Sequence, residues 1–278
     1  MIKVLALDLD GTVLNSKNAI SGALRDKIHA LKEIASVVLV TRRHHTAAKP
    51  YHHELGLNTP IICCNGSYVY DYSNARVIEH NAIDKTHAKE FIRLAEANNL
   101  NLVMYVKDAM LHSQSKPITY MQQLSNWAMH YSDELRPDIR CVASFVEELD
   151  KTEHVWKFVI EGDAVAAFDS LDFVRDNFSG ERSWVDRIDY AKHGNNKGSA
   201  LAQYVSSLGL GAQQVAAIGD NHNDISMLKY AGLGVAMLNA DDIVKQSAQL
   251  TTLAGNDDAR VLADLIDEIF QHNFSAVQ

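Results

Sequence analysis

The segment Val4–Leu14 reads VLALDLDGTVL and decides the fold class. Its apolar beginning is typical of a buried strand, yet Asp8 and Asp10 interrupt it just before Gly11. Residues i and i+2 of a strand point to the same face, so the two carboxylates are expected to lie side by side. Because this arrangement raises the energy of both ionised forms, the pair predicts a cation or another positive group beside it.

The composition is that of a soluble globular enzyme. The chain has 278 residues, of which 47% are hydrophobic and 22% charged, enough for one large or two modest domains. A formal net charge of -9 argues against a nucleic-acid binder and against a protein held on an anionic membrane. Without a signal peptide or a membrane-spanning run, we expect a cytoplasmic monomer or small homo-oligomer.

The order of the predicted elements indicates an α/β fold with an insertion. Short apolar strands such as SVVLV and QVAAIGD alternate with amphipathic helices, which is typical of a parallel sheet covered on both faces. Between them, strands rich in Val, Tyr, Trp and Phe indicate a smaller, mostly antiparallel α+β unit. We predict a core domain of residues 1–83 and 189–278 and an inserted cap domain of residues 84–188.

Polar residues gather where the predicted parallel strands end. Ligands of open parallel sheets bind at the carboxyl ends of the strands, so these residues are expected to meet at one edge. Lys197 precedes a helix in GNNKGSAL, and its ammonium adds positive charge. Carboxylates, a hydroxyl, an ammonium and backbone N–H groups together predict an Mg²⁺ and phosphate site. The residues at the strand ends are Asp8, Leu9, Asp10, Thr41, Arg42, Arg43, Asn65, Gly66, Gly219, Asp220, Asn221, Asn223 and Asp224.

Four segments carry a resemblance to a known family. DLDGT, the Thr of VTRRH, the Lys of NNKG and GDNHND occur in the order and with the separations of the four motifs of the haloacid dehalogenase superfamily of phosphohydrolases. The long insertion resembles the Cof-type subgroup, in which an α/β cap covers the active site. ICCNGSYVYDY, LVMYVKDAM and VWKF are similar to bacterial pyridoxal phosphate phosphatases of that subgroup. The resemblance implies a Rossmann-like parallel-sheet core with an inserted α+β cap.

The same resemblance implies an Mg²⁺-dependent phosphomonoester hydrolase with an aspartyl-phosphate intermediate. Asp8 is then the nucleophile, and Asp10 is the general acid and later the general base. The metal ligands implied are Asp8, the backbone carbonyl of Asp10 and Asp220, with Asp224 behind them. The groups implied to hold the phosphoryl oxygens are Thr41, Lys197, Asn223 and the backbone N–H groups of Leu9 and Arg42.

Arg42 departs from the family pattern, which usually has glycine at this position. With a negative φ, its N–H can still donate, and its guanidinium can point outward or reach a substrate anion. With a positive φ, the site would be strained or impaired. This departure leaves open a catalytically impaired protein that binds a phosphate ligand. A receiver domain that only stores the phosphoryl group is disfavoured by Asp10 and by the large cap.

The implied substrate is a small phosphorylated metabolite, and the resemblance points to pyridoxal 5'-phosphate. A sugar phosphatase of broad specificity is the alternative. The cap aromatics can stack on a flat ring, but for most of them a place in the core of the cap is favoured. Lys157 either pairs with a substrate anion or lies in solvent. The aromatic residues considered are Tyr105, Trp127, Trp156 and Phe158.

Overall fold

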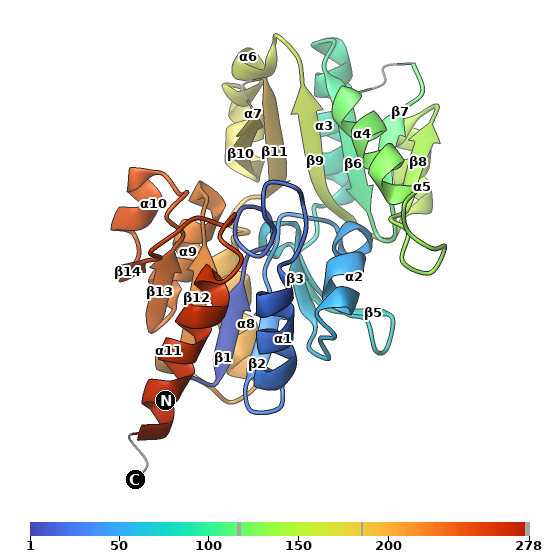
Figure 1. Cartoon of the computed structure of the whole chain (residues 1–278). Coiled ribbons are helices and arrows are strands. Elements are labelled where there is room, and N and C mark those ends of the chain that lie inside the picture. The colour runs from blue at the N-terminus through green and yellow to red at the C-terminus, as the bar shows by residue number, and fades with distance from the viewer. Residues whose placement is uncertain (116–117, 185, 276–278) are drawn as a thin grey trace. The chain divides into compact units, whose positions relative to one another are not determined.

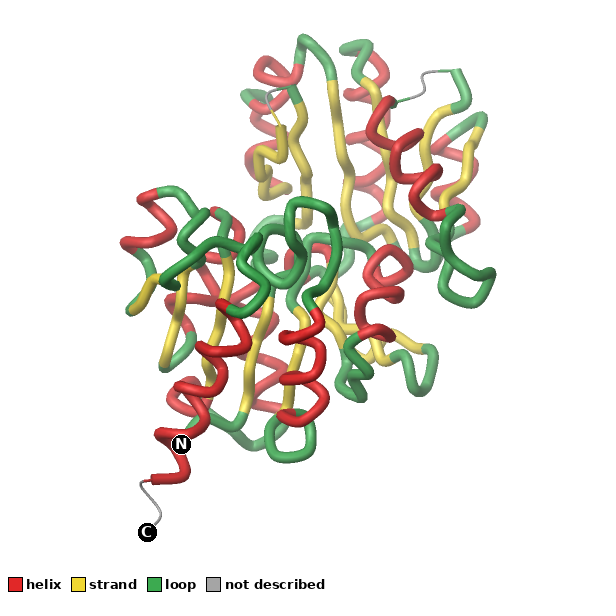
Figure 2. Tube along the Cα trace, in the orientation of Figure 1, coloured by secondary structure: helices red, strands yellow, loops and turns green. Residues whose placement is uncertain are grey.

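The fold is described from a computed structural model that covers residues 1–115, 118–184 and 186–275 (Figure 1). The chain divides into two compact units, each built from helices and strands joined by loops (Figure 2). We call the first the core unit; it comprises Met1–Arg42, Tyr51–Ile78 and Asn196–Gln278, described to residue 275. The second is the cap unit, which comprises Arg43–Pro50 and Glu79–Asn195.

A five-stranded parallel sheet forms the centre of the core unit. In spatial order its strands are β14 (Leu250–Thr251), β13 (Leu233–Ala236), β12 (Val215–Gly219), β1 (Val4–Leu7) and β2 (Ser36–Leu39). Val4 of β1 lies opposite Val215 on one side and Ser36 on the other. Every residue of β1 and β12 is buried, as expected for strands covered on both faces. The predicted parallel sheet is confirmed.

Helices cover both faces of this sheet. In Figure 1, α1 and α11 lie in front of the sheet and α8 lies behind it. Ser21 caps α1 by accepting the N–H of Leu24 at 3.2 Å, and Asn196 caps α8 by accepting the N–H of Ser199 at 2.8 Å. Among the described residues, no helix is long and apolar enough to cross a membrane. The elements are α1 (Gly22–Leu31), α8 (Lys197–Ser207), η2 (Ala212–Gln214), η3 (His222–Asp224), α9 (Ile225–Tyr230), α10 (Asp242–Gln246) and α11 (Val261–Ser275).

A three-stranded sheet continues from the end of β2. Val40 forms a parallel bridge with Ile62, and the N–H of Thr41 donates to the carbonyl of Ile62 at 2.9 Å. Ile62 belongs to β3 (Ile61–Cys63), so the carboxyl end of β3 lies beside the end of β2. The elements of this region are α2 (His45–Glu54), β3 (Ile61–Cys63), η1 (Cys64–Gly66), β4 (Tyr68–Asp71) and β5 (Arg76–His80).

The cap unit is built on a six-stranded sheet whose order is β10-β11-β9-β6-β7-β8. Its neighbouring strands are antiparallel except for β7 and β8, which are parallel. This confirms the predicted α+β insertion with a mostly antiparallel sheet. The strands are β6 (Asn101–Val106), β7 (Met110–Ser113), β8 (Ile139–Val142), β9 (Val155–Glu161), β10 (Phe178–Trp184) and β11 (Arg187–Lys192). The helices are α3 (Lys85–Ala97), α4 (Thr119–Ala128), α5 (Phe145–Lys151), α6 (Val165–Asp169) and α7 (Asp172–Asn177).

Neighbouring residues of β9 point to opposite faces of the cap sheet. Phe158 packs in the core of the cap unit, where its ring stacks on Phe91 with centroids 4.4 Å apart. The neighbouring Lys157 is also buried, donates to Asp189 at 2.6 Å and lies 4.5 Å from the ring centroid of Tyr105. A solvated Lys157, one of the two alternatives, is therefore wrong. Trp156 is also buried, in line with the expectation for most of the cap aromatics.

The two compact units differ in detail from the predicted domain limits. The chain passes from the core unit to the cap unit between residues 78 and 79 and returns between residues 195 and 196. The predicted domain boundaries lie between residues 83 and 84 and between residues 188 and 189. Residues 43–50, predicted with the core domain, group with the cap unit. Residues 116–117, 185 and 276–278 of the predicted domains lie outside the described residues. The functional limits of the domains stay a prediction.

Removing the ring of Phe158 should destabilise the cap unit. We expect Phe158→Ala to lower the free energy of unfolding by about 3–5 kcal/mol, because it removes a fully buried ring and leaves a cavity. Urea denaturation followed by circular dichroism measures this change. Ile34→Ala is the control, since Ile34 is 60% exposed, and should have little effect. Equal losses in both variants would contradict the assigned core.

Candidate active site

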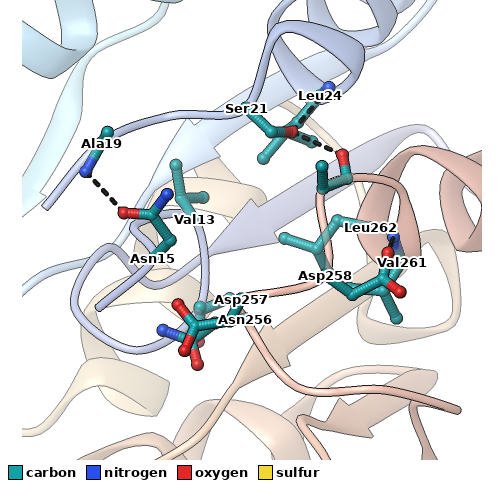
Figure 3. Close-up of a pocket in the computed structure, with 12 residues that line it drawn as sticks. Val13, Asn15, Ala19, Ser21, Leu24, Asn256, Asp257, Asp258, Val261 and Leu262 are labelled. Carbon is teal, nitrogen blue, oxygen red and sulfur yellow. Dashed lines mark hydrogen bonds between the residues drawn. The ribbon is translucent and has the colours of Figure 1, made fainter. Parts of the chain in front are cut away.

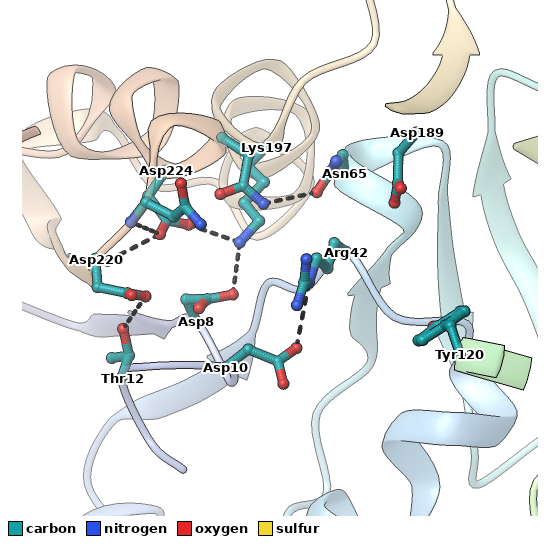
Figure 4. Close-up of polar contacts among 12 residues, drawn as sticks. Asp8, Asp10, Thr12, Arg42, Asn65, Tyr120, Asp189, Lys197, Asp220 and Asp224 are labelled. Atoms are coloured by element: carbon teal, nitrogen blue, oxygen red, sulfur yellow. Dashed lines mark hydrogen bonds and ion pairs between the residues drawn. The ribbon is translucent and has the colours of Figure 1, made fainter. Parts of the chain in front are cut away.

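The candidate active site lies at the carboxyl edge of the sheet in the core unit (Figure 4). Asp8 directly follows β1, Asp220 directly follows β12, and Thr41 comes shortly after β2. Lys197 is the first residue of α8 and Asp224 the last of η3. The structure therefore brings the predicted residues of separate strands and helices to one edge.

Lys197 is bound between two buried carboxylates. Its Nζ donates to Asp8 Oδ1 and to Asp224 Oδ1, both at 2.6 Å, and its side chain is fully buried (Figure 4). Burial acts to lower the pKa of Lys197, but attraction to Asp224 and Asp8 outweighs burial and raises that pKa. The ammonium thus stays charged and fixes one oxygen of each carboxylate.

Asp8 remains destabilised as an anion in spite of this ion pair. Burial raises the pKa of Asp8 well above its usual range, repulsion from Asp224 raises it further, and only Lys197 among its main neighbours lowers it. A carboxylate in such surroundings gains most from a further positive charge nearby. A cation beside Asp8, as predicted from the sequence, would therefore stabilise its ionised form.

Asp224 holds the loop that carries Asp220. Its Oδ2 accepts the backbone N–H groups of Asp220 and Asn221, each at 2.9 Å, while its Oδ1 accepts from Lys197. Both oxygens are therefore used within the protein. This agrees with the prediction that Asp224 supports the metal ligands and does not bind the metal itself. That role of Asp224 stays a prediction.

The carboxylate of Asp220 is packed against the loop that follows Asp10. Thr12 Oγ1 donates to Asp220 Oδ1 at 3.1 Å, and a Cβ at Gly11 would lie 2.2 Å from Asp220 Oδ2. Gly11 also has a φ of +82°, so glycine is required here for both space and conformation. Burial, and then repulsion from Asp224, raise the pKa of Asp220 to about 6.

Three carboxylates offer a suitable cation site. One oxygen from each of Asp8, Asp220 and Asp224 lies within 4.8 Å of the others. Carboxylate oxygens are preferred ligands of Mg²⁺, and burial, followed by repulsion from Asp224, raises the pKa of both Asp8 and Asp220, so a cation would stabilise their ionised forms. The residues therefore fit a divalent cation.

Arg42 pairs with Asp10 across the site. Its Nε lies 3.6 Å from Asp10 Oδ2, and both side chains are partly exposed (Figure 4). Arg42 is not one of the described non-glycine residues that have a positive φ. The strained alternative for this residue is therefore wrong, and its guanidinium reaches the predicted acid–base residue.

Asn65, which the sequence analysis placed at the strand ends without an individual role, contacts two of the predicted phosphate-binding residues. Its backbone N–H donates to the carbonyl of Thr41 at 3.1 Å, and its Oδ1 accepts from Asn223 Nδ2 at 3.1 Å. Thr41 and Leu9 are themselves buried at their strand ends. The available signal was an Asn-Gly pair at the end of a predicted strand.

A small pocket with mixed polar and apolar lining lies beside the loop that carries Thr12 (Figure 3). Asn256 Nδ2 donates to the carbonyl of Leu14 at 2.8 Å, and Ser21 Oγ donates to the carbonyl of Ala259 at 2.7 Å. These bonds connect the loop to the segment before α11. The residues around the pocket therefore hold the loop whose Thr12 donates to Asp220.

The fold and the site combine a parallel sheet with an acidic cluster at its carboxyl edge. A family model of haloacid dehalogenase-like hydrolases matches residues 5–263. The chain belongs to this family of enzymes, and the predicted family, fold class and phosphatase class are confirmed.

Named relatives agree with this assignment. Pyridoxal phosphate phosphatase YbhA of Escherichia coli (strain K12) is 38% identical over 252 residues, covering 89% of this chain and 92% of that protein. The 5-amino-6-(5-phospho-D-ribitylamino)uracil phosphatase YcsE of Bacillus subtilis (strain 168) is 32% identical over 257 residues, covering 90% of each. The crystal structure of a haloacid dehalogenase-like hydrolase from Bacteroides thetaiotaomicron has a TM-score of 0.83 at 27% identity, covering 97% of this chain and 100% of that chain.

The raised pKa of Asp220 predicts a pH effect on stability without metal. A carboxyl with a folded pKa of about 6 and a usual value of 3.8 favours folding when protonated, so its contribution is lost as pH rises through about 6. In EDTA, wild type should lose stability relative to Asp220→Asn between pH 4 and 7. Thermal unfolding measures the difference, and Mg²⁺ should reduce it. Asp26→Asn, at an exposed carboxylate, is the control; identical pH profiles for wild type and Asp220→Asn would contradict the assignment.

Proposed function

We propose that the protein is an Mg²⁺-dependent phosphomonoesterase that forms an aspartyl phosphate on Asp8 and prefers pyridoxal 5'-phosphate. The observation that carries this proposal is the buried Lys197 between Asp8 and Asp224, with Asp220 beside them. This arrangement fixes a nucleophilic carboxylate within an acidic cluster that suits a divalent cation.

In the first step, the Asp8 carboxylate attacks phosphorus and the ester P–O bond breaks. Lys197 holds Asp8 Oδ1, so the second oxygen is the one that forms the new P–O bond. Asp10 gives its proton to the leaving alkoxide. In the second step, Asp10 takes a proton from water, the water oxygen attacks phosphorus, and the Asp8–phosphorus bond breaks to release phosphate.

The phosphoryl group is held by donors at the same edge. We assign this task to Lys197, the hydroxyl of Thr41, the amide of Asn223 and the backbone N–H groups of Leu9 and Arg42, which would stabilise charge on the equatorial oxygens. Mg²⁺, when bound by Asp8, the carbonyl of Asp10 and Asp220, supplies compensation for the negative charges of carboxylate and phosphate. Asp224 acts by holding Lys197 and the loop of Asp220.

The substrate preference rests on similarity to YbhA, which is named a pyridoxal phosphate phosphatase. The proposed substrate is a small phosphorylated metabolite, and the proposed location is the cytoplasm. A sugar phosphatase of broad specificity is the second candidate. A catalytically impaired binding protein is the third, and Arg42 is the feature that favours it, because its guanidinium engages Asp10.

Turnover of a panel of esters tests the proposal. We expect Mg²⁺-dependent phosphate release that is fastest on pyridoxal 5'-phosphate, lost in EDTA and abolished in Asp8→Asn, since the amide is not a nucleophile. A phosphate-release assay with sugar phosphates and nucleotides as further substrates measures this. Faster turnover of a sugar phosphate would support the second candidate, and no turnover of any ester would support the third.

Replacing Arg42 tests how far its ion pair limits catalysis. We expect Arg42→Gly to raise kcat by about two- to fivefold, the scale of a partly exposed ion pair. The reason is that Asp10 no longer has to break its ion pair with Arg42 before it transfers a proton. KM should rise as well, since a positive charge beside the phosphate site is lost. Steady-state kinetics with Arg42→Lys as the charge-preserving control measure both values. An unchanged or lower kcat in Arg42→Gly would contradict this role.

A further inference from the structure

The turn at the end of β3 is conformationally strained. Cys64 has a φ of 49°, Asn65 of 55° and Gly66 of 89°, so three successive residues adopt left-handed backbone conformations. Only glycine does so without cost, although asparagine tolerates it better than most residues. Such strain persists where the surroundings fix the chain, and it is common at functional sites.

Contacts of this turn reach the residues assigned to phosphate. The N–H of Asn65 donates to the carbonyl of Thr41 at 3.1 Å. A Cβ at Gly66 would lie 2.3 Å from the carbonyl oxygen of Asn196, the residue that caps α8 directly before Lys197. The turn therefore packs against the backbone of one phosphate-binding residue and the backbone next to another.

The side chain of Asn65 orients a third such residue. Its Oδ1 accepts from Asn223 Nδ2 at 3.1 Å, and Asn65 is only 5% exposed (Figure 4). At the other end of the Asn223 amide, Oδ1 is buried and has no hydrogen-bond partner among the described residues. Since Oδ1 has no partner to hold it, the hydrogen bond from Nδ2 to Asn65 is the contact that orients the Asn223 amide.

We infer that Asn65 is a positioning residue of the phosphate site, which acts by directing one N–H of Asn223 to itself so that the other is presented to a phosphoryl oxygen. The left-handed turn places Asn65 for this purpose. The inference rests on the proposed function, because it takes Asn223 as a phosphate ligand. It adds a residue to the site and assigns a use to the strained turn.

Asn65→Gly is the decisive variant. Glycine keeps the left-handed backbone without strain, so the fold should persist with a modest loss of thermal stability from the missing side chain and its hydrogen bond. We expect KM, and the Kd of inorganic phosphate measured by calorimetry in Mg²⁺, to rise roughly three- to tenfold, the scale of a lost neutral hydrogen bond. The value of kcat should change much less, because binding of substrate and transition state weakens together.

A double-mutant cycle separates this role from a general structural one. If Asn65 acts through Asn223, Asn65→Gly added to Asn223→Ala should change the phosphate Kd no further. Asn18→Gly, the same substitution at an exposed position with a φ of 56°, is the control. Should the glycine form not fold, Asn65→Asp is the second variant, because aspartate tolerates positive φ and keeps an acceptor for Asn223 Nδ2.

The outcomes distinguish the inference from the proposed function. A wild-type phosphate Kd and KM in Asn65→Gly, or additive effects in the cycle, would overturn the positioning role. Failure of wild type to hydrolyse any ester would overturn the proposed function, while the phosphate titrations would still decide the inference. Absence of phosphate binding to wild type in Mg²⁺ would overturn the inference, whereas the proposed function would still be decided by ester turnover.

Discussion

The ion cluster of Lys197, Asp8 and Asp224 is the interaction on which the functional edge depends. A buried ammonium or carboxylate is unfavourable alone, and each is tolerated here because its partner lies at 2.6 Å. The three groups come from α8, from the end of β1 and from η3, so one cluster fixes the relative positions of three elements. It holds more negative than positive charge, and burial, followed by repulsion from Asp224, raises the pKa of Asp8.

The functional edge is locally unfavourable, and the sheet beneath it supplies the stability. Repelling carboxylates and a left-handed turn would not persist on a flexible surface. Asp8 and Asp220 follow β1 and β12, the turn follows β3, and all residues of these three strands are buried. A close-packed apolar sheet is therefore the platform that allows such an arrangement to exist.

Sequence patterns predicted the parts of the fold and site that depend on local periodicity. Apolar strands alternating with helices predicted the parallel sheet, and the carboxyl-end rule brought Asp8, Lys197 and Asp220 together. Long-range packing determined what was missed. An Asn-Gly pair is typical of an ordinary turn, and the partner that distinguishes Asn65 lies 158 positions away. The conformation of Arg42 and the burial of Lys157 likewise depend on neighbours that no local pattern identifies.

The division of the chain has a consequence for biosynthesis. Nearly all of the cap unit is one continuous stretch, whereas the core unit is assembled from three separate segments. A ribosome therefore completes the cap sequence before it has made α8, β12 or η3, and domains generally fold as units during synthesis. Asp8 is made before the cap sequence, whereas its ammonium partner, Lys197, follows 189 positions later. The carboxylate of Asp8 therefore cannot pair with Lys197 until the cap sequence has been made, so the ion cluster at the edge of the core sheet assembles after the cap sequence.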